Sequence, residues 1–246
     1  MTKPDMIYGT RAVMEAIVAG REIERLFIQK GLNNELLREL LRLVRERNIS
    51  FTYVPVEKLN RFTPKNHQGV VCLLSSVTYA SLDDLIHFAY SQGREPFFII
   101  LDRITDVRNF GAIARTAECA GVDGLIIAEK GSAPVSGDAM KTSAGALNHL
   151  PVCREKDLRK TVKFLHDNGV TVIACTEKAA KTIYEVVISG PIALLMGSEE
   201  DGISDDLLRT CDELVKIPMS GKIGSLNVSV AAGIAIYEIV RQRTFR

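Results

Sequence analysis

The chain has 246 residues, of which 46% are hydrophobic and 25% charged, and its formal net charge is +1. This length allows one large domain or two modest ones, each with a core of its own, and the composition excludes wholesale disorder. The near-neutral total does not indicate a strongly basic nucleic-acid binder. Residues 1–77 nevertheless carry 12 Lys and Arg against 8 Asp and Glu, so a mildly basic N-terminal part precedes a slightly acidic remainder.

Five cysteines and four histidines are scattered along the chain, and no Cys-x-x-Cys pair occurs. This pattern argues against a disulfide framework or a zinc site and favours a reducing compartment. We therefore expect no metal, and cysteines that serve as buried apolar filler. The N-terminus lacks an apolar signal-peptide core and no run reaches about 18 apolar residues, so we expect a cytoplasmic protein without a membrane segment.

Helices and strands alternate from the start, which predicts a small α/β domain over residues 1–76. Leucines at helical spacing follow Asn33 and Asn34, either of which would cap a helix. The predicted elements, in chain order, are a helix at 9–19, a strand at 24–28, a helix at 33–47 and strands at 49–54 and 70–75.

Residues 77–94 change character and are expected to form a linker with one helix, begun by a capping box of Ser81 with Asp84 and ended by Gly93. A second domain is expected over residues 95–246. Its apolar runs are continuous rather than alternating, which indicates strands covered on both faces and hence a parallel sheet with helices on either side. These strands are predicted at 97–102, 124–128, 170–175, 192–196 and 213–217.

A first polar cluster follows the strand that ends at Asp102. Its loop precedes a helix of small residues at 110–120 and contains Arg103, Asp106, Arg108 and Asn109. The small residues indicate that something packs closely against this helix, which Arg115 interrupts with a long cation. Two structural alternatives stay open: Arg115 extends to solvent or pairs with Glu118, and Asn109 is only a helix cap.

A second cluster follows the strand at 192–196. Gly197 lets a ligand or another backbone approach closely. Beyond it lie Glu199, Glu200, Asp201, Gly202 and a helix start at Ser204. A charged turn before a capped helix is the plain alternative. The position is nonetheless one where parallel α/β sheets bind ligands, outside the carboxyl ends of their strands.

A third cluster, IPMSGKIGSLNVS, begins at Ile217. Met219 ends a strand, Gly221 and Gly224 allow unusual backbone angles, and Asn227 would cap the last helix. The sequence contains neither the G-x-G-x-x-G fingerprint nor a phosphate-binding P-loop, and no Ser-His-Asp set or two-metal carboxylate cluster stands out.

Together the three clusters resemble the motifs of the SpoU, or TrmH-type, branch of the SPOUT methyltransferases, over the whole of residues 95–246. The phrase SLNVSVAAGIAIYEIVRQR makes the resemblance specific. In the N-terminal part, MIYGTRAVMEAI and NHQGVV look like the small RNA substrate-binding domain of bacterial 23S rRNA guanosine 2′-O-methyltransferases, which is similar to ribosomal protein L30-type folds. The family implies a Rossmann-like sheet whose C-terminal segment forms a deep trefoil knot, one of the few exceptions to unknotted chains.

The resemblance further implies S-adenosylmethionine as cofactor, in a bent shape and held mainly by backbone groups near Gly197, Ile217, Met219 and Leu226. A neutral adenine edge needs N–H and C=O partners rather than charges. By position, the family's catalytic residues match Asn109 and Arg115 in the first motif, Glu199 in the second, and Ser225 and Asn227 in the third. Many relatives carry Gly after that glutamate. This chain has Glu200, whose side chain must point outward or alter the loop.

Methyl transfer is an in-line displacement in which the ribose 2′-oxygen attacks a carbon on a sulfonium, so it needs a positioned, partly deprotonated hydroxyl. The family's candidate for activating this hydroxyl is Arg115. Because the pKa of arginine lies above about 12, we favour a role in which Arg115 fixes the adjacent phosphate and lowers the pKa of the hydroxyl electrostatically; general-base action stays open. The residues expected to orient Arg115, the loop and the ribose are Asn109, Glu199, Ser225 and Asn227.

The small-residue helices at 110–120 and 228–236 suit close packing at a knot or at a subunit interface. The resemblance implies a homodimer through this region, with Arg108 and Arg115 facing RNA beside it. Candidates for phosphate contacts in the N-terminal domain are Arg11, Lys30, Arg61 and Lys65. Three functions stay open: methylation of a guanosine ribose in 23S rRNA, methylation of a tRNA ribose, and a catalytically silent RNA-binding or ribosome-assembly factor. The N-terminal domain disfavours the second, and the retained motif residues disfavour the third.

Overall fold

The computed structural model describes residues 6–198 and 200–245, and the chain divides into two compact units. The first unit comprises Met1–Thr78 together with Pro134–Asp138, and the second comprises Tyr79–Ala133 and Ala139–Arg246. The five residues from the later part of the chain are joined to the first unit by backbone bonding, since the N–H of Ser76 donates to the carbonyl of Val135 at 2.9 Å.

The first unit is a four-stranded mixed sheet with helices on both faces. Its elements are β1 (Met6–Tyr8), α1 (Thr10–Val18), β2 (Ile23–Gln29), α2 (Glu35–Glu46), β3 (Phe51–Val54), α3 (Val56–Phe62) and β4 (Val70–Leu74). The strand order is β1-β4-β2-β3, with β4 antiparallel to both neighbours and β2 parallel to β3. All five elements predicted here are confirmed. Asn34 caps α2 by accepting from the N–H of Leu37 at 2.8 Å.

Apolar side chains on both faces of this sheet explain its helices. On one face, α1 and α2 bury Val13, Ile17, Leu37, Leu40 and Val44 against residues of β2 and β4. On the other face, Leu59 of α3 packs with Phe27, Val54 and Val71. The sequence did not predict β1 or α3, because the first has three residues and the second only seven.

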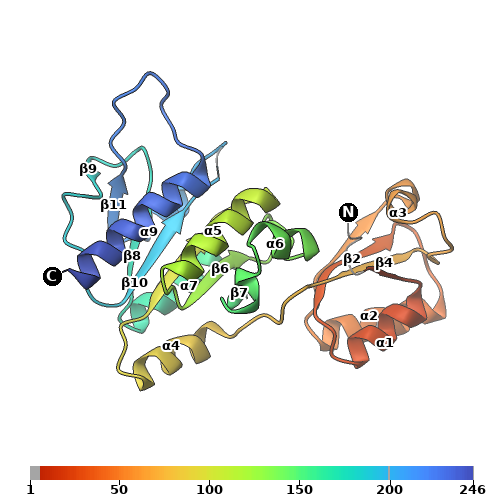
Figure 1. Ribbon diagram of the computed structural model, residues 1–246. Helices are drawn as coiled ribbons and strands as arrows, with labels where there is room; N and C mark the ends of the chain where they lie inside the picture. Colours follow the sequence, from red (N-terminus) through yellow and green to blue (C-terminus); the bar gives the residue numbers. More distant parts are fainter. Residues whose placement is uncertain (1–5, 199, 246) are drawn as a thin grey trace. The chain divides into compact units, whose positions relative to one another are not determined.

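The second unit begins with a helix and continues as alternating strands and helices. Its elements are α4 (Leu82–Ser91), β5 (Phe97–Leu101), α5 (Val107–Cys119), β6 (Gly124–Ala128), all but the first two residues of α6 (Gly137–Thr142), a 3-10 turn (Ala146–Asn148), β7 (Val152–Glu155), α7 (Leu158–Asp167), β8 (Thr171–Cys175), β9 (Lys181–Thr182), β10 (Ile192–Met196), α8 (Asp205–Leu208), β11 (Glu213–Lys216) and α9 (Val228–Thr244). Figure 1 shows α9 running beside α5, and the two helices are in contact.

The described strands of this unit form one sheet in the order β7-β6-β5-β10-β8-β11-β9, and all their pairings are parallel. The predicted parallel sheet is therefore confirmed. From β5 the chain moves outward through β6 and β7, and then returns to the other side to form β8. Strand β10 lies between β5 and β8, so the direction of strand addition changes there, which is where open α/β sheets bind ligands.

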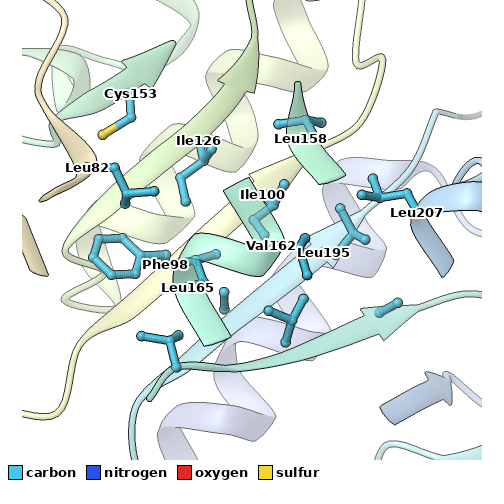
Figure 2. Close-up of a cluster of buried hydrophobic side chains, with 14 of the residues drawn as sticks. Leu82, Phe98, Ile100, Ile126, Cys153, Leu158, Val162, Leu165, Leu195 and Leu207 are labelled. Carbon is cyan, nitrogen blue, oxygen red and sulfur yellow. The ribbon is translucent and has the colours of Figure 1, made fainter. Parts of the chain in front are cut away.

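The strands are covered on both faces. One face packs against α4, α7 and α8, and Figure 2 shows this cluster, which includes Leu82, Phe98, Ile100, Ile126, Leu158, Val162, Leu165, Leu195 and Leu207. Helix α4 lies in the segment expected to be a linker, but Leu82 and Ile86 are buried in this core. Side chains alternate along a strand, so Ile99 and Leu194 face the other side, where α5 and α9 lie.

Several local expectations can be compared with the structure. Ser81 caps α4 by accepting from the N–H of Asp84 at 3.3 Å, and Gly93 has the positive φ of a helix terminator. Cys72 and Cys153 are buried, but Cys119 is exposed at the end of α5, so the expectation that every cysteine is buried was wrong. Within residues 6–198 and 200–245, no helix has the length and apolar character needed to cross a membrane, and no group of three side chains is arranged to hold a metal ion.

Candidate active site

The carboxyl ends of three adjacent strands surround a cavity of about 370 Å³, here called the first hollow. Residues at the ends of β8, β10 and β11 form its base, and the segment before α9 forms one side. All four residues predicted to hold a cofactor line this hollow: Gly197, Ile217, Met219 and Leu226. The remaining described lining residues include Thr176, Glu177, Glu200, Asp201, Lys216, Ser225 and Ala231.

Gly197 is required by a close approach of backbone to backbone. A Cβ at this position would lie 2.3 Å from the carbonyl carbon of Gly202 and 2.3 Å from the nitrogen of Ile203. The turn from Ser198 to Gly202 folds back here, because the N–H of each of these two residues donates to the carbonyl of the other, at 3.2 and 3.1 Å. The missing side chain therefore accommodates the chain's own turn.

A second hollow of about 350 Å³ adjoins the first and shares four lining residues with it. The shared residues are Ser198, Glu200, Asp201 and Val228. The second hollow is completed by the loop after β5 and the start of α5, including Arg103, Asp106 and Asn109. Ser198, Glu200 and Asp201, which lie in the turn closed by Ser198 and Gly202, thus form the wall that the two hollows share.

The first and third sequence clusters meet at this place. Asn227 caps α9, as predicted, because its Oδ1 accepts from the N–H groups of Ser229 and Val230. Its Nδ2 donates to Oδ1 of Asn109 at 3.0 Å. Asn109 does not cap α5, since Asp106 fills that position and its Oδ1 accepts from the N–H of Asn109 at 2.9 Å. The helix-cap alternative for Asn109 was therefore wrong, and its side chain is used in a tertiary contact.

The other predicted catalytic residues differ in whether they line one of the two hollows. Ser225 is exposed and lines the first hollow. Arg115 is exposed six residues beyond Asn109 on α5, and it is not among the described residues that line either hollow. Glu199 lies outside the described residues. The side chain of Glu200 is exposed.

The small residues of α5 have a structural cause. A Cβ on Gly111 would lie 2.0 Å from Oγ1 of Thr142 at the end of α6, and this hydroxyl donates to the carbonyl of Val107 at 3.2 Å. The close packing expected against this helix is therefore provided in part by α6, and it fixes the turn of α5 that presents Asn109.

Two protein-family models match the chain. Residues 96–237 match the SpoU rRNA Methylase family, and residues 6–80 match the RNA 2′-O ribose methyltransferase substrate binding model. The chain belongs to the SpoU rRNA methylase family. It is therefore an S-adenosylmethionine-dependent methyltransferase with an RNA substrate.

Relatives and solved structures agree with this assignment. The chain is 34% identical over 239 residues to YacO of Bacillus subtilis (strain 168), which is assigned to the TrmH family of tRNA/rRNA methyltransferases; the match covers 97% of this chain and 96% of YacO. The SpoU methyltransferase AviRb from Streptomyces viridochromogenes, in complex with AdoMet, aligns with a TM-score of 0.61 and 28% identity, over 98% of this chain and 90% of that one. The AdoMet-bound rRNA methyltransferase from Sinorhizobium meliloti aligns with a TM-score of 0.61 and 25% identity, over 100% and 89%.

The first hollow fits the cofactor of this SpoU family. Its volume suits a ligand of nucleoside size, and the four predicted residues line it. Its charged lining is acidic, with Glu177, Glu200 and Asp201 against Lys216. Such a lining complements S-adenosylmethionine, whose ammonium and sulfonium outweigh its single carboxylate.

Cys175 places a thiol in the wall of the first hollow. Burial, and secondarily the charge of Glu177, raise the pKa of Cys175 to about 11, so the thiolate is scarce at neutral pH. A covalent adduct on Cys175 is therefore disfavoured.

Sequence reasoning missed two pairs of residues at this site. Thr176 and Glu177 follow β8 and line the first hollow, but their relevance depends on β8 being the neighbour of β10, which the sequence does not state. Asp102 and Arg103 were noted only as the end of a strand and part of a loop. The buried carboxylate of Asp102 accepts from the N–H of Ser204 at 3.0 Å and thereby anchors the start of α8.

Proposed function

We propose that this enzyme transfers a methyl group from S-adenosylmethionine to the ribose 2′-oxygen of a guanosine in 23S rRNA. The observation that carries the proposal is the hydrogen bond between Asn227 and Asn109. Asn109 lines the second hollow, and Asn227 follows Leu226 of the first hollow and precedes Val228, which lines both. This bond supports a first hollow for the cofactor and a second for the target nucleoside, with one shared wall between them. The description of the model matched by residues 6–80 supports the ribose 2′-oxygen as the acceptor.

The cofactor, when bound, supplies a methyl carbon made electrophilic by the sulfonium. The protein's residues then have to hold the ribose and make its hydroxyl more acidic. We assign the orientation of the ribose and its surroundings to Asn109, Glu199, Ser225 and Asn227. We assign to Arg115 the neighbouring phosphate of the RNA, since a fixed guanidinium lowers the pKa of a nearby hydroxyl by favouring its anion.

The position of Arg115 suits that role. Its side chain is exposed on α5, where it can reach a large polyanionic substrate that extends beyond the second hollow. A phosphate contact needs this exposure, whereas a general base would have to lie within hydrogen-bond reach of the hydroxyl proton. The electrostatic role is therefore favoured over general-base action.

We further propose the arrangement that the family resemblance implies. The second unit would contain a deep trefoil knot near its C-terminus, and α5 and α9 would form a homodimer interface. Exposed residues on these helices fit an interface, including Cys119, Val230 and Tyr237. The first unit would be an L30-like RNA-binding domain that uses the exposed Arg11, Lys30, Arg61 and Lys65. A cytoplasmic location follows from such a substrate.

A methyl-transfer assay tests the function. Total rRNA and tRNA from a strain lacking this gene are incubated with the enzyme and S-adenosylmethionine tritiated at the methyl group, and the labelled nucleotide is mapped. Label in a 2′-O-methylguanosine of 23S rRNA is expected. Label in tRNA would favour the second function, and label in neither RNA, with cofactor binding intact, would favour a silent RNA-binding factor. Label on a base rather than a ribose would overturn the proposed chemistry.

A further inference from the structure

Arg103 adopts a backbone conformation that its side chain disfavours. Its φ is 57°, in the left-handed region, two residues after β5 ends. Glycine enters this region freely, whereas a residue with a Cβ meets a steric penalty. A left-handed arginine beside a candidate active site calls for a compensating interaction, since such conformations persist where the surroundings hold them.

The guanidinium of Arg103 supplies that interaction. Its Nη1 donates to Oδ2 of Asp201 at 3.1 Å, and its Nη2 donates to the carbonyl of Gly202 at 3.0 Å. These partners lie about a hundred residues further along the chain. The same guanidinium is 3.4 Å from the carboxylate of Asp102, which also accepts from the N–H of Ser204. Asp102 and Arg103 together hold residues 201–204 against the end of β5.

The segment held in this way is the wall between the two hollows. Gly202 offers its carbonyl both to Arg103 and to the N–H of Ser198, which closes the turn. Ser198, Glu200 and Asp201 face both hollows from this turn. Any loosening of the turn would therefore change the shape of the cofactor site and of the neighbouring site at the same time.

We propose that Arg103 is a positioning residue for methyl transfer. It fixes the turn closed by Ser198 and Gly202, and so keeps the cofactor and the target nucleoside correctly placed relative to each other. The proposal rests on the proposed function of the two hollows. A guanidinium suits this task because its planar fork reaches a carboxylate and a carbonyl at once, whereas an ammonium is a single point charge. Glycine would relieve the backbone strain, but it has no side chain that could bind Asp201 or Gly202.

The test compares Arg103→Gly with Ala144→Gly, a matched control. Ala144 is another non-glycine residue of the second unit with a left-handed backbone, at φ 51°, and it is exposed. Both changes remove the same kind of backbone strain, but only Arg103→Gly also removes the side-chain hydrogen bonds to Asp201 and Gly202. We expect Ala144→Gly to leave all kinetic constants at their wild-type values.

For Arg103→Gly we expect kcat to fall and the KM for S-adenosylmethionine to rise, each by about tenfold, which is the effect of losing one charge-assisted hydrogen bond. Backbone amides of residues 200–204 should exchange hydrogen faster, with the melting temperature within about 3 °C of wild type. Arg103→Lys should recover part of the KM because it keeps a cation near Asp201. A structural role alone would lower the melting temperature and leave the kinetics of the folded enzyme unchanged.

The outcomes separate this inference from the function on which it rests. If the wild-type enzyme neither binds S-adenosylmethionine by calorimetry nor methylates RNA, the proposed function fails. If the wild-type enzyme is active and Arg103→Gly retains its kcat, its KM and its exchange pattern, the function stands and the positioning role is wrong. Equal recovery of activity by lysine and by glutamine at position 103 would also contradict it, because glutamine has no charge.

Discussion

Nδ2 of Asn227 donates to Oδ1 of Asn109 at 3.0 Å, although 118 positions separate the two residues in the chain. The same side chain caps α9 through its Oδ1. Asn227 thus couples the start of the last helix to the first turn of α5, the two helices that lie side by side on one face of the sheet. Its two roles, as a helix cap and as a partner of Asn109, can be separated by substitution.

Asn227→Ala and Asn227→Ser distinguish these roles. Alanine removes both the cap and the bond to Asn109, and we expect it to lower the free energy of unfolding by about 1 kcal/mol and to reduce methyl transfer. Serine is an equally good cap but is too short to reach Asn109, so stability should stay within a few tenths of a kcal/mol while transfer still falls. Thermal denaturation and the tritium assay give the two readouts. Full activity of Asn227→Ser would show that the bond to Asn109 is dispensable.

Arg115→Ala should abolish methyl transfer and leave cofactor binding nearly intact. The side chain lies outside the described lining of the first hollow, so its loss should remove a contact to RNA and none to the cofactor. Calorimetric titration with S-adenosylmethionine and the tritium assay measure the two effects. Lys163→Ala, which removes an exposed cation from α7, is the control and should change neither. An equal loss of cofactor binding and transfer in Arg115→Ala would mean that the role of Arg115 is structural.

The sequence predicted the strands whose apolar residues form continuous runs. Strands β5, β6, β8 and β10 are such runs, whereas the missed strand β9 has only two residues and the missed strand β7 ends in Arg154 and Glu155. Strand β11 was predicted although two of its four residues are charged. Helix α7 could have been predicted, because Leu158, Val162 and Leu165 recur at helical spacing.

The candidate site was predictable only where a motif is continuous in the chain. The glycine and the loop residues around the first hollow came from the family resemblance, and the structure brings them together. Glu177 and Arg103 act through neighbours that are set by strand order and by a turn folding back, and the partners of Arg103 lie 98 and 99 positions away. Local patterns carry no information on such pairings, nor on a left-handed arginine.

Gly197→Ala should damage the first hollow directly. The new methyl group would overlap the backbone of Gly202 and Ile203, so the turn must move, at a cost of about 1–3 kcal/mol in the free energy of unfolding. We expect a lower melting temperature and weakened binding of S-adenosylmethionine by calorimetry. Gly221→Ala is the control, since a Cβ there meets nothing within 4 Å. Wild-type cofactor affinity in Gly197→Ala would show that the turn does not shape the cofactor site.

Glu238 predicts an acid-sensitive contribution to stability. Hydrogen bonds from the Arg241 guanidinium lower the pKa of this buried carboxyl below its ordinary value of 4.5, and Gln242 donates to it as well. A carboxyl with a lowered pKa in the folded state stabilises the fold above its unfolded pKa, and this contribution disappears as the pH falls through the folded pKa. Gln242 in turn accepts from the N–H of Ile188, so the pair secures the segment before β10 to α9.

Glu238→Gln should therefore melt below wild type at pH 7, and the gap in melting temperature should narrow as the pH is lowered from about 5 to about 3. Glu118→Gln, a change of an exposed carboxyl on α5, is the control and should show a small gap at every pH. A gap for Glu238→Gln that widens on acidification would contradict the sign of the pKa shift.

The cations of the first unit should appear in the salt dependence of RNA binding. Each phosphate contact contributes about 0.7 to the slope of log affinity against log salt for single-stranded RNA. If Arg11 and Lys65 each contact a phosphate, Arg11→Ala with Lys65→Ala should lower that slope by roughly 1.4 while leaving kcat at saturating RNA unchanged. The control is Lys160→Ala with Lys163→Ala, which removes the same charge from the exposed surface of α7 and should leave the slope unchanged. Filter binding of the full-length enzyme at several salt concentrations measures both slopes. Because the two double variants have the same net charge, equal slopes would mean that Arg11 and Lys65 act only through overall charge.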